Sequence, residues 1–275
     1  MTAFIHIDLE CRLFDIDIMI SEGKMLYYIY DGTFDGFLAA VWESIERDEV
    51  PEQIVTSNKL EINLFTETRV VKTDFNKAKE LLGKIIEKLS RSGLKTMLYC
   101  YLADEPGSEV VLCEYLRKVL AVDENIETKL ADPTVLKVKK IREKVAKEVH
   151  RYKGIVRFRE IEPGFFYGPI EPDHQITSLL ADHFRRRFAD QRWFIHDRRR
   201  NCGVLYDGDG VRFLKDVELK PELEEINSGC YSKEELEWEG LWNVYFKSIE
   251  IKERSNPKLQ RQYLPARYWR YLVEK

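Results

Sequence analysis

The sequence lacks the features that are typical of membrane proteins, secreted proteins and small proteins stabilised by a metal ion. None of its apolar runs approaches the about 20 residues that a membrane helix requires. Its cysteines are odd in number, widely scattered and without a CxxC pair, which disfavours a disulfide framework or a zinc ribbon. They are Cys11, Cys100, Cys113, Cys202 and Cys230. No secretory signal is visible either. We therefore expect a cytoplasmic protein with reduced thiols and no membrane contact.

Motifs of nucleotide and hydrolase chemistry are missing too. The sequence has no Walker A loop, no GxGxxG after a strand, no GxSxG elbow and no HExxH. Asp207-Gly-Asp-Gly210 resembles the start of a calcium loop but lacks the further ligands and the terminal glutamate, so we interpret it as a tight turn. We predict neither a metal ion nor another cofactor.

The charge of the chain is unevenly distributed. The 275 residues have a net charge of −4, with 44 % hydrophobic and 33 % charged residues. Residues 1–136 hold 15 Lys and Arg against 25 Asp and Glu, whereas residues 137–275 hold 29 against 23. The cations gather at residues 137–159 and 185–200, and an acidic stretch follows at residues 216–239. Such asymmetry indicates contact with nucleic acid, and its alternative is a set of solvated helix faces.

Hydrophobic periodicity predicts an α+β protein. We expect a mainly helical region over residues 25–153 and an α+β region over residues 154–275, packed together as one compact unit. The second region reads as an antiparallel β-meander with flanking helices. Glu22-Gly23-Lys24 before Met25 is what a purine-rich ribosome-binding site would spell if translated. This predicts that residues 1–24 are a mis-annotated extension and that Met25 is the natural start.

Histidines and carboxylates suggest a catalytic site. A His and carboxylate set supplies general acid–base chemistry or, less favoured, binds a metal ion. The candidates are Glu171, Asp173, His174, His183, His196 and Asp197. The structural alternative makes Asp173 the N-cap of a helix and His183 a buried, satisfied ring.

Basic residues interleaved with aromatic ones suggest a nucleic-acid interface. Guanidinium groups suit phosphate contacts, and aromatic rings suit base stacking. The candidates are His150, Arg151, Lys153, Arg157, Arg159, Arg185, Arg192, Trp193, Arg198, Arg200, Arg267 and Trp269. For the aromatic residues, packing in the core is the alternative.

Several motifs together resemble one bacterial family, the domain-of-unknown-function family 4130. The matching segments are Tyr30-Asp-Gly-Thr-Phe34-Asp-Gly-Phe, Val71-x-Thr73-Asp74, His150-x-x-x-Gly154-x-x-Arg157-Phe158, Ile170-Glu-Pro-Asp-His174, His183-Phe184 with Phe188, Trp193-x-Ile195-x-Asp197, Arg254-x-Asn256 and Pro265-x-Arg267-Tyr-Trp269. The resemblance extends from Met25 to Glu274. It implies a role in DNA metabolism or DNA repair, beside a radical S-adenosylmethionine protein that resembles photoproduct lyases.

Three functions stay open from the sequence. The chain has no CxxxCxxC motif, so the resemblance implies the stand-alone partner of the radical enzyme, and we expect it to bind nucleic acid, DNA in preference to RNA. The second hypothesis is an enzyme that modifies nucleic acid with the His and carboxylate groups. The third is a protein-binding scaffold whose arginines pair with its own acidic stretch.

Overall fold

The computed structural model describes residues 25–60, 65–217, 231–249 and 251–274. The chain divides into two compact units. The N-terminal unit comprises Met1–Tyr101 and Glu105–Arg142, and the C-terminal unit comprises Leu102–Asp104 and Glu143–Lys275. The prediction for residues 1–24 lies outside the described residues, as do Cys11 and Cys230.

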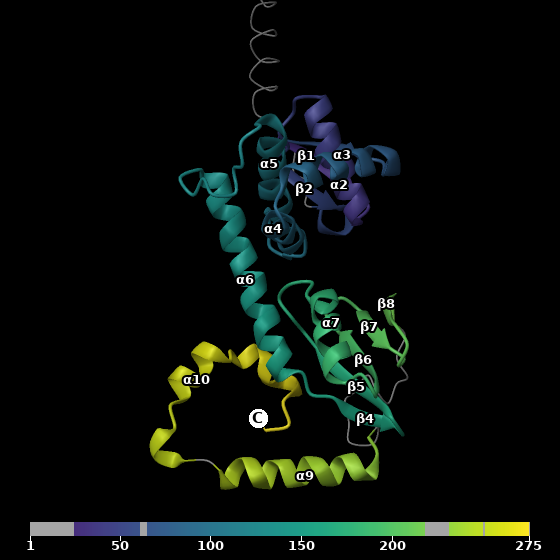
Figure 1. Ribbon diagram of the computed structural model, residues 1–275, viewed down its shortest axis with the longest axis vertical. Coiled ribbons are helices and arrows are strands. Elements are labelled where there is room, and N and C mark those ends of the chain that lie inside the picture. The colour runs from purple at the N-terminus through teal and green to yellow at the C-terminus, as the bar shows by residue number, and fades with distance from the viewer. Residues whose placement is uncertain (1–24, 61–64, 218–230, 250, 275) are drawn as a thin grey trace, which may run out of the picture. The chain divides into compact units, whose positions relative to one another are not determined.

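The N-terminal unit is mostly helical, as predicted, and also contains a small parallel sheet (Figure 1). Its elements are β1 (Met25–Tyr30), α2 (Phe34–Glu46), β2 (Gln53–Thr56), η1 (Ser57–Lys59), β3 (Thr66–Val70), α3 (Phe75–Lys88), α4 (Arg91–Tyr101), α5 (Ser108–Ala121) and the first part of α6 (Pro133–Ile155). The strand order is β2-β1-β3, and both pairs are parallel.

Local signals set the helix starts in this unit. The Thr33 hydroxyl accepts from the backbone N–H of Gly36, and the Asp74 carboxylate accepts from the first turn of α3, so each helix has an N-cap. The apolar stripe of α2 is fully buried at Phe37, Leu38 and Val41, where the helix packs against α3 and α5. Burial of one stripe per helix holds this layer together.

The C-terminal unit contains a five-stranded sheet with helices beside it (Figure 1). Its elements are the rest of α6, β4 (Arg159–Glu162), β5 (Phe165–Ile170), α7 (Thr177–Arg187), β6 (Arg192–Asp197), β7 (Cys202–Tyr206), β8 (Val211–Lys215), α9 (Lys233–Ser248), η3 (Lys252–Arg254), α10 (Pro257–Tyr263) and η4 (Ala266–Tyr271). The strand order is β4-β5-β6-β7-β8. The predicted α+β class, with flanking helices at a C-terminal sheet, is confirmed.

One strand pair departs from the predicted antiparallel meander. β4–β5, β6–β7 and β7–β8 are antiparallel, but β5 and β6 run parallel, with Phe166 opposite Trp193. The reason is α7, which follows β5 and packs against β6, β7 and β8. Parallel neighbours need such a crossover, whereas a hairpin joins antiparallel strands.

The core of this unit lies between α7 and the sheet. Trp193 is 1 % exposed, and its ring packs against those of Phe158, Phe184 and Tyr206. Gly203 on β7 lies so close to the Phe194 ring that a Cβ there would overlap it. Phe194 lies on the opposite face of the sheet from Trp193, beside Tyr167 and His196. Any larger residue at position 203 would displace its ring.

Cys100, Cys113 and Cys202 are free, and burial raises the pKa of the Cys113 thiol to about 11. In the segments that the structure describes, no helix has the length and apolar character to cross a bilayer.

Candidate nucleic-acid interface

A buried carboxylate organises the C-terminal unit. Glu148 on α6 is 2 % exposed, because it shares the inward stripe of the helix with Val145 and Val149. It accepts hydrogen bonds from the backbone N–H groups of Asp173 and His174, both 2.8 Å, and from the Tyr268 hydroxyl at 2.7 Å. Glu148 therefore ties α6 to the segment before α7 and to η4.

The predicted catalytic carboxylates beside this network have partners from η4. Asp173 forms an ion pair with Arg267 at 2.8 Å, and Glu171 forms one with Arg270 at 2.7 Å. Glu171 also accepts from the Tyr271 hydroxyl. The expected N-cap role of Asp173 is wrong, because Ile176 occupies that position and α7 has no side-chain cap. Both carboxylates hold the C-terminal segment in place.

A second buried network surrounds Arg200, one of the predicted nucleic-acid contacts. Its guanidinium group pairs with Asp197 and with Asp104, each at 2.8 Å. It also donates to the carbonyls of Pro172 and Asp173. Asp197 is fully buried, and this burial raises its pKa although Arg200 acts in the opposite direction. We conclude that Arg200 and Asp197 stabilise the fold, because their charged groups pair with each other.

The three histidines predicted as catalytic have different surroundings. His174 is held through its backbone by Glu148, and His183 lies on α7 beside the end of α6, where it bonds to the backbone of Lys153. His196 is 2 % exposed and bonds to the Tyr167 hydroxyl at 2.9 Å and to Asn201 at 3.3 Å. Across the described ranges, no three His, Cys, Asp or Glu side chains gather as a metal ion would need.

His196 is expected to make the protein less stable in mild acid. Burial lowers the pKa of its imidazole below the usual 6.5, and the hydrogen bond to Asn201 offsets only part of this. As the pH falls below about 6.5, the unfolded chain takes up the proton before the folded chain does. The stabilising contribution of the neutral ring is thus complete above that pH and is lost as the pH falls through the folded pKa.

Urea unfolding at pH 7.5 and pH 5.0 measures this effect. The wild-type protein should lose more free energy of unfolding between the two pH values than the His196→Gln variant, which has no titrating ring there. An equal loss in both proteins would show that His196 is protonated in the folded state as readily as in the unfolded state.

Other residues that were predicted to contact nucleic acid contact groups of the C-terminal unit itself. Arg157 pairs with Glu274 at 2.6 Å, and Arg159 pairs with Glu239 at 2.5 Å and lies over the Tyr231 ring. Trp193 belongs to the core, and the Trp269 indole donates to the Leu264 carbonyl. Arg198 lies partly buried after β6, and its backbone N–H donates to Ile170. Arg192 is exposed at the β4–β5 turn, where it donates to Pro163.

The ion pair of Arg159 with Glu239 matches one part of the scaffold hypothesis. That hypothesis expected Arg185–Arg187 or Arg198–Arg200 to pair with residues 222–239. Instead, Arg185 and Arg186 pair with Asp182, and Arg200 pairs with Asp104 and Asp197. Residues 218–230 lie outside the described residues, so the rest of that expectation stays a prediction.

The remaining cations form a surface on α6 and α7 that is exposed except at the half-buried Lys153. We call it the basic surface, and it consists of Lys147, His150, Lys153, Arg185, Arg186 and Arg187. The two helices meet at His183, whose pKa is lowered by burial and by the positive charges of Lys153 and Arg187. Within the part of the chain that the structure describes, Lys147, Lys153 and Arg187 form no ion pair. These charges are therefore available to an anionic partner.

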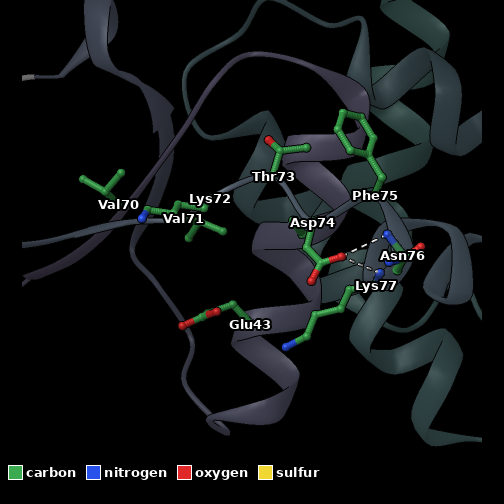
Figure 2. Close-up of a pocket in the computed structure, with 10 residues that line it drawn as sticks. Glu43, Val70, Val71, Lys72, Thr73, Asp74, Phe75, Asn76 and Lys77 are labelled. Atoms are coloured by element: carbon green, nitrogen blue, oxygen red, sulfur yellow. Dashed lines mark hydrogen bonds between the residues drawn. The ribbon is translucent and has the colours of Figure 1, made fainter.

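A groove in the N-terminal unit was not predicted from the sequence. It encloses about 610 Å³ between α2 and the segment that joins β3 to α3, and its walls include Glu43, Lys72 and Thr73 (Figure 2). Figure 2 shows the Asp74 carboxylate turned to the backbone N–H groups of Asn76 and Lys77, at 2.9 and 3.2 Å. The start of α3 is thus already capped by a carboxylate of the chain itself.

Comparison with known proteins supports the resemblance seen in the sequence. The family described as "Domain of unknown function (DUF4130)" matches residues 106–274, more than half of the chain. The chain belongs to this family. No curated protein and no solved structure matches it. The match covers the C-terminal unit and the end of the N-terminal one, so the resemblance over residues 25–105 stays a prediction.

Proposed function

We propose that this DUF4130 protein binds nucleic acid through the basic surface. The supporting observation is that Lys147, Lys153 and Arg187 form no ion pair in the described segments. Lys147 and Arg187 are exposed and Lys153 is half-buried, and buried Glu148 anchors α6, the helix that carries the two lysines. Phosphate groups are the polyanion that such a row of cations suits, and their contacts supply most non-specific affinity.

The exposed ion pairs on α7 fit the same proposal. Arg185 and Arg186 pair with Asp182 at the surface, where all three side chains are more than half exposed. Pairs of this kind contribute little stability, so both guanidinium groups can turn to a phosphate at small cost. Arginine is well suited to this contact, because its planar fork donates two parallel hydrogen bonds.

The proposed biological role is that of an accessory protein in DNA metabolism or repair. The resemblance implies a radical S-adenosylmethionine enzyme as its partner, and we propose that the DUF4130 protein presents the nucleic acid to that enzyme. DNA is favoured over RNA as the substrate. The alternative enzymatic function is less favoured, because Glu171 and Asp173 pair with arginines of η4 and Asp197 pairs with Arg200.

Fluorescence anisotropy across a salt series tests the binding. We expect labelled single-stranded or duplex DNA to bind with an affinity that falls steeply as salt rises. The Lys147→Gln/Lys153→Gln variant should bind more weakly and reduce the slope of log K against log salt by about 0.7–0.9 for each lysine removed. The affinity of RNA measured in parallel shows whether DNA is preferred.

A matched control variant distinguishes the effect of the basic surface on binding from the effect of overall charge. Lys79→Gln/Arg91→Gln removes two exposed cations from the N-terminal unit and should leave the slope unchanged. If both double variants lose the same slope, binding does not depend on the basic surface. If the wild-type protein binds none of the nucleic acids at low salt, the surface does not serve nucleic acid. Co-purification with the radical enzyme would then show whether it faces that protein.

A further inference from the structure

A groove lies where the end of α9 meets α10. It encloses about 560 Å³, which is within the range of small-molecule pockets. Its walls include Phe246, Ile249, Arg254, Asn256, Gln260 and Tyr263. Tyr263 is 69 % exposed and Ile249 is 53 % exposed. Large apolar side chains exposed together in this way are typical of a binding site.

The groove combines the chemical groups that recognise a nucleobase. Tyr263 and Phe246 provide aromatic faces, and Asn256 and Gln260 provide amides. The Asn256 side-chain oxygen accepts from the backbone of Leu259 at 3.0 Å, which leaves its NH₂ group as a donor. Aromatic faces bind any base by stacking, and amides pair with donors and acceptors on its edge.

The surroundings of the groove are positively charged. Residues 253–261 contain Arg254, Lys258 and Arg261 against Glu253. Neither Arg254 nor Lys258 forms an ion pair among the residues that the structure describes. A purely apolar protein segment would gain nothing from these charges, whereas a nucleotide carries a phosphate beside its base.

The groove also adjoins the helix that carries the basic surface. The Arg151 guanidinium on α6 donates to the Tyr263 carbonyl at 3.1 Å, so the end of α10 is fastened to α6. His150, a member of the basic surface, is the neighbour of Arg151 in the chain. A strand whose phosphates follow α6 therefore passes close to Tyr263.

We propose that this groove holds one unstacked nucleobase of a single-stranded nucleic acid, with Tyr263 stacked on the base. The inference rests on the proposed function and adds that the nucleic acid is single-stranded. A base inside a duplex is stacked on both sides and cannot enter the groove, so the proposal predicts a preference for single strands.

Oligonucleotides with and without bases test the proposal. The full chain is titrated with a labelled 15-mer of thymidine nucleotides and with a 15-mer of the same length whose residues are all abasic. We expect the wild-type protein to bind the thymidine strand about tenfold more tightly, because stacking on one ring contributes a factor of this order. The Tyr263→Ala variant should bind both strands with the affinity of the abasic strand.

Two further variants control the comparison. Tyr263→Phe keeps an aromatic face and should retain the preference for bases. Trp238→Ala removes another aromatic ring, 68 % exposed on α9 but outside the groove, and should also retain it. Loss of the preference in Trp238→Ala but not in Tyr263→Ala would overturn the assignment to this groove.

The two proposals fail in distinguishable ways. Equal affinity of the wild-type protein for both strands, with a steep salt dependence, would overturn the base-binding groove and leave the basic surface standing. Binding of neither strand at low salt would overturn both proposals. Capture of an apolar peptide in this groove, without displacement by the thymidine strand, would assign it to a protein partner instead.

Discussion

The Arg200→Met variant is expected to lose about 3–5 kcal/mol of the free energy of unfolding of the C-terminal unit. The substitution leaves Asp197 as a buried carboxylate without its cation, and it removes donors from Asp104 and from two backbone carbonyls. Breaking one side of a buried ion pair costs more than removing both, because the remaining charge keeps its desolvation penalty.

Urea denaturation followed by circular dichroism measures this loss. Arg199→Met is the matched control, since Arg199 is the exposed neighbour and its replacement should change stability by less than about 0.5 kcal/mol. The double variant Asp197→Asn/Arg200→Met removes both charges and should lose less than the sum of the two single variants. Strict additivity would mean that the pair does not interact in solution.

The Glu148→Ala variant is expected to lose about 3 kcal/mol or more. Glu148 accepts from two backbone N–H groups and one phenol hydroxyl, and each buried donor left without an acceptor costs about 1–3 kcal/mol. The loss should be accompanied by release of η4, because Tyr268 bonds to Glu148. Faster backbone hydrogen exchange in residues 266–271 would report that release.

Two variants keep this prediction falsifiable. Glu148→Gln retains one acceptor oxygen and should lose less stability than Glu148→Ala. Glu143→Ala removes an exposed carboxylate from the same helix and should be close to neutral. A Glu148→Ala protein as stable as Glu143→Ala, with η4 protected from exchange, would show that the segment before α7 is held by other contacts.

Local patterns in the sequence were sufficient for most of the helices and strands. Apolar residues recur at helical spacing in α3 and α6, and Glu162-Pro163-Gly164 is a turn signal between β4 and β5. These signals are local, because periodicity and turn chemistry act over a few residues. Glu148 lies on the apolar face of α6 between Val145 and Tyr152, and a carboxylate at such a position indicates a buried acid.

Strand pairing could not be read from the same patterns. The strands β5 and β6 look like members of a meander, yet they are parallel, and β1 lies between β2 and β3 in a parallel sheet. A strand carries the same alternation of side chains whichever neighbour it has and in whichever direction that neighbour runs. The position of α7 on the sheet determines the pairing, and that position depends on contacts between distant segments.

By itself, the sequence determined which segments are helical, where the cations are concentrated and which family the motifs resemble. Only the tertiary structure decided which of those cations are available. Arg157 and Lys153 belong to the same basic run, but Arg157 pairs with Glu274, which is 117 residues away in the chain. Lys153, half-buried beside His183, forms no ion pair among the described residues. An ion pair forms between groups that folding brings within a few ångströms of each other. The number of residues between two groups in the sequence does not predict that distance.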